Sequence, residues 1–142
     1  MAMAVLLSLG GVQQAKAGDL TVVVTGVTSD QGLIRICLAR EGEEASFPDC
    51  HHAAPSRRAI VKARAGDVDA VFHDLPAGKW AVAAFHDVDG DGVLKKNWLG
   101  IPLEGIGASR NPRRVFGPPR FDQAALTVGA QGGFVTFALV YP

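Results

Sequence analysis

Hydrophobic and polar residues alternate along most of the chain, and this period of two is typical of β-strands that bury one face. Gly, Pro, Asp and Ser residues separate the alternating segments, and no segment shows a convincing helical period. We therefore predict an all-β fold, a single antiparallel β-sandwich of about seven short strands. The expected strands are residues 20–25, 33–39, 58–64, 68–75, 79–86, 124–128 and 133–141.

Turn residues between neighbouring segments suggest how these strands pair. Segments 20–25 and 33–39 are expected to form one hairpin, and 124–128 with 133–141 another. In segment 79–86 both faces are apolar, which favours a central position in a sheet.

One stretch does not fit the strand pattern. Residues 87–121 form 35 residues of irregular sequence, whereas loops longer than about 12–15 residues are uncommon in compact domains and are usually functional. We therefore expect the functional chemistry of the protein in this long loop.

The long loop opens with three aspartates at alternate positions, Asp87, Asp89 and Asp91, followed by Gly92. This spacing matches the first half of a calcium-binding loop, in which alternate carboxylates converge on one hard cation. The backbone carbonyl of Val93 and the side chain of Asn97 are the further ligands that we expect.

The second half of the calcium pattern is missing. Counted from Asp87, the ninth position is Lys95 and the twelfth is Trp98, where a bidentate carboxylate would stand. Asp-Gly sequences also form ordinary metal-free turns. A weak Ca²⁺ site and a metal-free turn therefore remain alternatives at this point.

The first 17 residues have the features of a secretory signal peptide. An apolar run at residues 1–9 is followed by the small-x-small site Ala15-Lys16-Ala17, although the usual basic start is missing. Cleavage after Ala17 would leave residues 18–142 as one domain in the periplasm or outside the cell. We expect no transmembrane segment in that domain, because no other apolar run is long enough.

The two cysteines of the chain, Cys37 and Cys50, agree with export. An even number of cysteines in an exported domain favours a disulfide, and the alternative is two free thiols.

Composition limits the class of partner. The 14 Lys and Arg residues balance 14 Asp and Glu residues, so the chain lacks the basic excess typical of nucleic-acid-binding proteins. Hydrophobic residues make up 48% of the chain, enough for a core, and 17 Gly and 8 Pro fit a fold rich in turns.

An ordered series of motifs resembles a bacterial exported family, that of domain of unknown function 2141. The series comprises Leu75-Pro76-Ala77-Gly78, then His86-Asp87 with the aspartate loop, and then residues 99–109, LGIPLEGIGAS. Pro119-Arg120-Phe121-Asp122-Gln123-Ala124 completes it. The resemblance implies an exported transthyretin-like or immunoglobulin-like β-sandwich and brings no established activity. Lys95 departs from the acidic residue that is common in the family.

Several other residues are candidates for a ligand surface. His86 beside Asp87 suggests a general base, but adjacent strand residues point to opposite faces. Trp98 is either a ligand-stacking aromatic or, as we expect, a plug for the open end of the core. The basic run 110–120 either binds an anionic surface or pairs with the aspartates. The candidate surface residues are His86, Trp98, Glu104, Arg113 and Arg114.

These observations predict an exported binding module rather than an enzyme, with an unknown ligand or envelope partner and no nucleic acid. The alternatives are a hydrolase-like enzyme that uses the His86/Asp87 region and a structural envelope or assembly protein.

Overall fold

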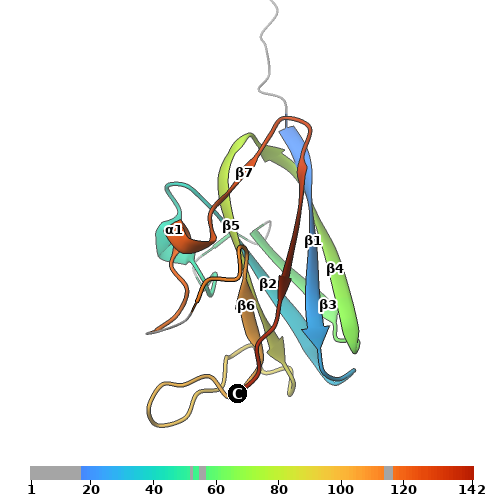
Figure 1. Ribbon diagram of the computed structural model, residues 1–142, viewed down its shortest axis with the longest axis vertical. Coiled ribbons are helices and arrows are strands. Elements are labelled where there is room, and N and C mark those ends of the chain that lie inside the picture. The colour runs from blue at the N-terminus through green and yellow to red at the C-terminus, as the bar shows by residue number, and fades with distance from the viewer. Residues whose placement is uncertain (1–16, 52, 55–56, 114–116) are drawn as a thin grey trace, which may run out of the picture.

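The computed structural model describes residues 17–51, 53–54, 57–113 and 117–142, and in this part of the chain eight strands form two packed sheets (Figure 1). Helical structure is limited to a 3-10 turn and one short helix. The fold is thus almost entirely β, as the alternating pattern predicts. The elements are β1 (Ala17–Val27), β2 (Leu33–Arg40), η1 (Glu44–Ser46), β3 (Arg58–Lys62), β4 (Gly66–Pro76), β5 (Gly78–Asp87), β6 (Ile106–Ala108), α1 (Phe121–Ala124), β7 (Leu126–Val128) and β8 (Gly133–Ala138).

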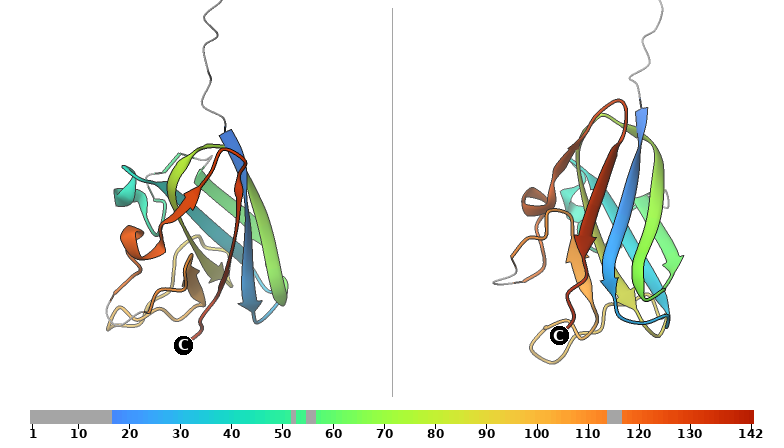
Figure 2. Two further views of the ribbon diagram at one scale, coloured as in Figure 1. Left: turned by 45° about the horizontal axis from the view of Figure 1, so that its top comes forward. Right: turned by 45° about the vertical axis from the view of Figure 1, so that its right-hand side comes forward.

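The two sheets face each other as a β-sandwich (Figure 2). The smaller sheet has the strand order β4-β1-β8, and its β1–β8 pair is parallel. The larger sheet has the order β3-β2-β5-β6, with β7 also pairing to β5, and all of its pairs are antiparallel. The sandwich is therefore mixed rather than purely antiparallel.

Both predicted hairpins are wrong. Strand β1 lies in the smaller sheet and β2 in the larger one, and β7 and β8 are divided in the same way. The alternating pattern shows which face of a strand is buried, but both sheets bury their inner faces in one core. The pattern therefore cannot tell a hairpin from a crossover between sheets.

The long irregular stretch also contains a strand that the sequence pattern did not reveal. Residues Ile106–Ala108 form β6 and pair with β5. Three residues are too few to show a period of two, so this strand was not predicted.

The main core lies between the two sheets and contains the residues that the alternation assigns to the inner faces. In β1 these are Leu20, Val22 and Val24, all fully buried. In β2 and β5 the inner residues are likewise buried, and they include Ile34, Ile36, Leu38, Trp80, Val82 and Ala84.

Strand β5 is central in the larger sheet, as predicted, since it pairs with β2 on one edge and with β6 and β7 on the other. Its outer face is covered as well. Ala81 and Ala83 pack there against Ala124 of α1, with Phe47 and Phe121 alongside. The two phenylalanines meet edge to face at 6.3 Å between ring centroids.

The predicted disulfide is present. It joins Cys37 on the outer face of β2 to Cys50 in the following loop, with the two Cα atoms 5.5 Å apart. The bridge ties the loop that carries Phe47 to the sheet.

The predicted signal peptide lies almost entirely outside the described residues, of which Ala17 in β1 is the first. None of the helices in the described part of the chain has the length and apolar character needed to cross a membrane.

Candidate cation-binding loop

The last two residues of β5 point to opposite sides of the larger sheet, because successive side chains of a strand alternate. His86 faces the interior of the sandwich, and Asp87 lies on the outer face. Both side chains are fully buried. A segment from Val88 to Gly105 then returns to β6, and we call it the acidic loop.

Asp87 is held by an arginine of the neighbouring strand. Arg35 of β2 stands opposite Phe85 of β5, so its side chain is on the same face as Asp87 and two positions away. Its Nε donates a hydrogen bond to Asp87 Oδ2 at 2.5 Å, and the backbone N–H of Gly92 donates to the same oxygen at 2.8 Å. The other oxygen, Oδ1, is buried and has no hydrogen-bond partner among the described residues.

Asp89 and Asp91 complete a cluster with Asp87. One carboxylate oxygen from each of the three residues lies within 4.8 Å of the others. Asp91 also accepts a hydrogen bond from the backbone N–H of Val93 at 2.9 Å. The three carboxylates, two of them exposed, therefore form a group that can hold a metal ion.

Lys95 is the second cation at the cluster. Its Nζ lies 2.5 Å from Asp89 Oδ2, and this hydrogen bond lowers the pKa of the Asp89 carboxyl and raises the pKa of the Lys95 ammonium. Arg35 and Lys95 thus offset two of the three negative charges. The oxygen of Asp87 that lacks a partner remains beside a net negative charge.

Gly92, the glycine that follows the three aspartates, has a left-handed backbone with φ of +80°. A residue with a Cβ is disfavoured there, because few side chains adopt this conformation. The backbone N–H of Gly92 is then free to turn back toward Asp87.

Glu104 fastens the two ends of the acidic loop. Its side chain is buried, and its two oxygens accept hydrogen bonds from the backbone N–H groups of Val88 and Lys95, both at 2.9 Å. Glu104 is therefore a loop-organising residue and not part of an open ligand surface, contrary to our expectation.

The outer part of the acidic loop is a small hairpin. The N–H of Leu103 donates to the carbonyl of Lys95 at 2.8 Å, and the N–H of Asn97 to the carbonyl of Ile101 at 2.9 Å. Asn97 Oδ1 accepts hydrogen bonds from Leu99 and Ile101 at 2.9 and 3.0 Å. In this conformation Asn97 stabilises the hairpin, and its side-chain oxygen is used there rather than at the aspartates.

Trp98 lies at the end of this hairpin with 90% of its surface exposed. Our expectation that it plugs the core is therefore wrong. The core is instead closed at this end by His86 and Tyr141, whose rings meet edge to face at 5.9 Å between centroids.

His86 uses both ring nitrogens inside the protein. Nε2 lies 2.6 Å from the carbonyl oxygen of Gln31 and must carry the proton, since a carbonyl only accepts. Nδ1 then accepts from the Tyr141 hydroxyl at 2.7 Å. His86 is thus no surface residue, and it points away from Asp87 rather than pairing with it.

The basic run contributes little to the acidic loop in the described part of the chain. Arg113 is exposed, whereas Arg114 lies outside the described residues. Arg110 donates to the carbonyl of Ala125 at 3.4 Å, and Arg120 pairs with Asp122 at 3.2 Å. Among the described residues of this run, 110–113 and 117–120, no pairing with the aspartates is seen, and Arg35 and Lys95 supply the cations instead.

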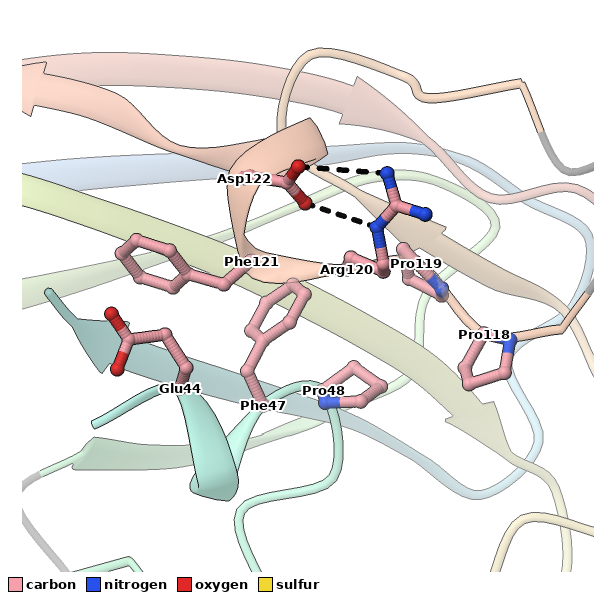
Figure 3. A pocket seen from close by; sticks show the side chains of 8 residues that line it. All are labelled: Glu44, Phe47, Pro48, Pro118, Pro119, Arg120, Phe121 and Asp122. Carbon is pink, nitrogen blue, oxygen red and sulfur yellow. Dashed lines mark hydrogen bonds and ion pairs between the residues drawn. The ribbon is translucent and has the colours of Figure 1, made fainter. Parts of the chain in front are cut away.

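A separate hollow of about 480 Å³ lies between the η1 loop and α1 (Figure 3). Its walls are mainly the rings of Phe47, Pro48, Pro118, Pro119 and Phe121. The polar side chains at its rim already have partners: Arg120 pairs with Asp122, and Glu44 accepts a hydrogen bond from Gly42. The described residues that line the hollow therefore include no convergent set of free polar groups.

Arg35 is the part of the site that sequence reasoning missed. The alternation of β2 correctly places it on the outer face, but nothing local shows that β2 lies beside β5 at this register. Glu104 was expected on a ligand surface, and only the folded loop shows that its carboxylate accepts hydrogen bonds from backbone N–H groups instead.

Comparisons with known proteins identify the family. No curated protein and no solved structure matches the chain. The model of a family described as uncharacterised proteins conserved in bacteria, domain of unknown function 2141, matches residues 22–134. Because this match spans most of the two sheets and the whole acidic loop, the chain belongs to that family.

Proposed function

We propose that the protein is an exported binding module whose working surface is the acidic loop, and that Asp87, Asp89 and Asp91 bind Ca²⁺ weakly. The main support for the cation site is the buried Oδ1 of Asp87. This oxygen lacks a hydrogen-bond partner in the described part of the chain, and Asp87 belongs to the aspartate cluster. An unsatisfied buried carboxylate oxygen is costly, and a cation would satisfy it.

The chemistry of the ligands favours a hard cation. The three candidate donors are carboxylate oxygens, which suit Ca²⁺, and the loop is exposed enough to admit further water ligands. Arg35 would keep its bond to Oδ2 of Asp87, whereas Lys95 would have to leave Asp89. This competition is the reason for a weak site.

Export is supported by the signal-like sequence at residues 1–17 and by the Cys37–Cys50 disulfide, which is typical of oxidising compartments. A binding role is favoured over hydrolysis because His86 is fully engaged with Gln31 and Tyr141 and does not converge with Asp87.

Isothermal titration calorimetry of the protein with CaCl₂, together with its melting temperature, tests the cation site. We expect binding at submillimolar to millimolar Ca²⁺ and a rise in melting temperature, because a ligand of the folded state stabilises it. Absence of heat and of any shift at millimolar Ca²⁺ would overturn the calcium site.

A matched pair of variants locates the site. Asp91→Asn retains an oxygen for the hydrogen bond from Val93 but loses one charge, and we expect at least tenfold weaker Ca²⁺ binding. Asp69→Asn removes an exposed aspartate of β4 and should bind like the wild type. Equal affinities for the two variants would contradict the assignment to the cluster.

A further inference from the structure

The hairpin of the acidic loop carries an unusual share of the exposed apolar surface. The described residues include ten large hydrophobic side chains that are exposed, and five of them lie within residues 93–103. A cluster of this kind, unlike scattered single residues, marks an interaction site. The five are Val93 (57% exposed), Trp98 (90%), Leu99 (61%), Ile101 (50%) and Leu103 (52%).

The hairpin holds these side chains out in a defined conformation. Trp98 and Leu99 are the two central residues of a turn that is closed by a hydrogen bond from Gly100 N–H to the carbonyl of Asn97 at 2.9 Å. Asn97 Oδ1 and the pairing of Lys95 with Leu103 fix the rest of the hairpin. The loop projects from the end of the sandwich beside the C-terminus (Figure 1).

The charged side chains of the hairpin are all positive. Residues 93–103 contain two lysines and neither Asp nor Glu. Lys95 pairs with Asp89, while the ion pairs of the described residues leave Lys96 without a carboxylate. Lys96 precedes Trp98 by two residues, which in an extended chain is about 7 Å.

We infer that this hairpin inserts its tip, Trp98 and Leu99, into the interface of an anionic phospholipid bilayer. The inference names a partner for the acidic loop and so rests on the proposed function of that loop, but it does not require a bound cation. Tryptophan is enriched at the boundary between headgroups and acyl chains. Apolar residues of interfacial segments enter about 5–10 Å, so Lys96 would lie at the depth of the lipid phosphates.

The acidic cluster gives this membrane contact a calcium dependence. Asp89 and Asp91 precede the hairpin in the acidic loop and repel anionic headgroups, and Lys95 of the hairpin offsets only one of them. Bound Ca²⁺ would displace Lys95 from Asp89 and add its own two positive charges to the cluster, which strengthens the attraction to anionic headgroups. In the presence of a calcium chelator the inserted tip would still bind the membrane, though less tightly.

The two tryptophans of the chain make insertion directly measurable. Trp80 is fully buried, so a change in emission on adding vesicles reports on Trp98. With vesicles of two parts phosphatidylcholine to one part phosphatidylglycerol, we expect a blue shift of the emission and protection from iodide quenching. Unchanged emission and quenching would overturn the inference.

Sedimentation with the same vesicles compares three variants. Trp98→Ser/Leu99→Ser should lower the partition coefficient at least tenfold, because it removes both inserted side chains. Phe134→Ser, which removes an exposed aromatic of β8 elsewhere, should bind like the wild type. Lys96→Gln should lower binding about fivefold, and only to anionic vesicles. All variants share the same N-terminal residues, so that differences between them report on the substituted positions.

The outcomes separate this inference from the proposed calcium site. Vesicle binding that persists without any calorimetric heat for Ca²⁺ supports insertion and removes only the cation site. Calcium binding without vesicle binding overturns only insertion. If gel filtration shows a dimer that Trp98→Ser/Leu99→Ser converts to a monomer, and vesicles do not bind, the tip contacts a second copy of the chain and the inference is wrong.

Discussion

Arg35 and Asp87 stand 52 residues apart in the sequence and form an ion pair on the outer face of the larger sheet, with 2.5 Å between Nε and Oδ2. The carboxylate is fully buried and the arginine is one-quarter exposed. The pair anchors the start of the acidic loop to β2, because Asp87 also accepts the N–H of Gly92. The conformation of the loop thus depends on a strand far away in sequence.

Removal of the arginine should destabilise the protein. Arg35→Met leaves the buried Asp87 carboxylate without its cation, and we expect the free energy of unfolding to fall by about 2 kcal/mol, less than for a completely buried pair. Urea denaturation followed by circular dichroism measures the change. Arg58→Met, at an exposed position of β3, should stay within about 0.5 kcal/mol of the wild type. Equal losses in both variants would contradict a specific role for the ion pair.

Removal of the competing lysine should tighten calcium binding. Lys95 Nζ lies on Asp89, and so Lys95→Gln should lower the dissociation constant for Ca²⁺ about three- to tenfold by removing a like charge from the site. Calorimetry measures the affinity. Lys96→Gln removes the same charge from the neighbouring residue and serves as the control. It should change the dissociation constant for Ca²⁺ less. A weaker affinity in Lys95→Gln would show that the lysine supports the site rather than competes for it.

The stabilisation that the Asp89–Lys95 pair contributes should be lost at acid pH. The hydrogen bond from Lys95 lowers the pKa of Asp89 from its ordinary value of 3.8. A lowered folded-state pKa means that the pair contributes its stabilisation above the ordinary value and loses it as the pH falls through the folded value, below 3.8. Carboxyl NMR titration should give an Asp89 midpoint below 3.8 that returns toward 3.8 in Lys95→Gln. Lys96→Gln should leave the midpoint where it is in the wild type.

The hydrogen bond between the buried His86 and Tyr141, the only tyrosine of the chain, should contribute to the stability of the protein. In Tyr141→Phe the Nδ1 of His86 loses its donor, and we expect a loss of about 1–3 kcal/mol in the free energy of unfolding, because a buried acceptor is left unsatisfied. Thr136→Val removes an exposed hydroxyl of β8 and serves as the control, with a change below about 0.5 kcal/mol. If Tyr141→Phe is as stable as this control, the His86–Tyr141 contact does not stabilise the core.

The sequence predicted the buried faces of the strands well, and the pairing of the strands poorly. Leu20, Val22 and Val24 are inward-facing as expected, because the alternation of a single strand already records which side leaves water. The partner of each strand depends on contacts across the whole chain, and so β1 pairs with β4 and β8 rather than with β2. The three residues of β6 are too short to carry a local signal at all.

For the candidate site, the sequence by itself determined the residue types that meet: three aspartates at alternate positions, Gly92 with its left-handed backbone, and a cysteine pair that forms the disulfide. These follow from short-range spacing and from a count of two cysteines. Only the tertiary structure placed Arg35 beside Asp87, buried Glu104 under the loop and left Trp98 exposed. Those features depend on which strands are neighbours and on which backbone N–H groups a folded loop leaves open, and no local pattern records either.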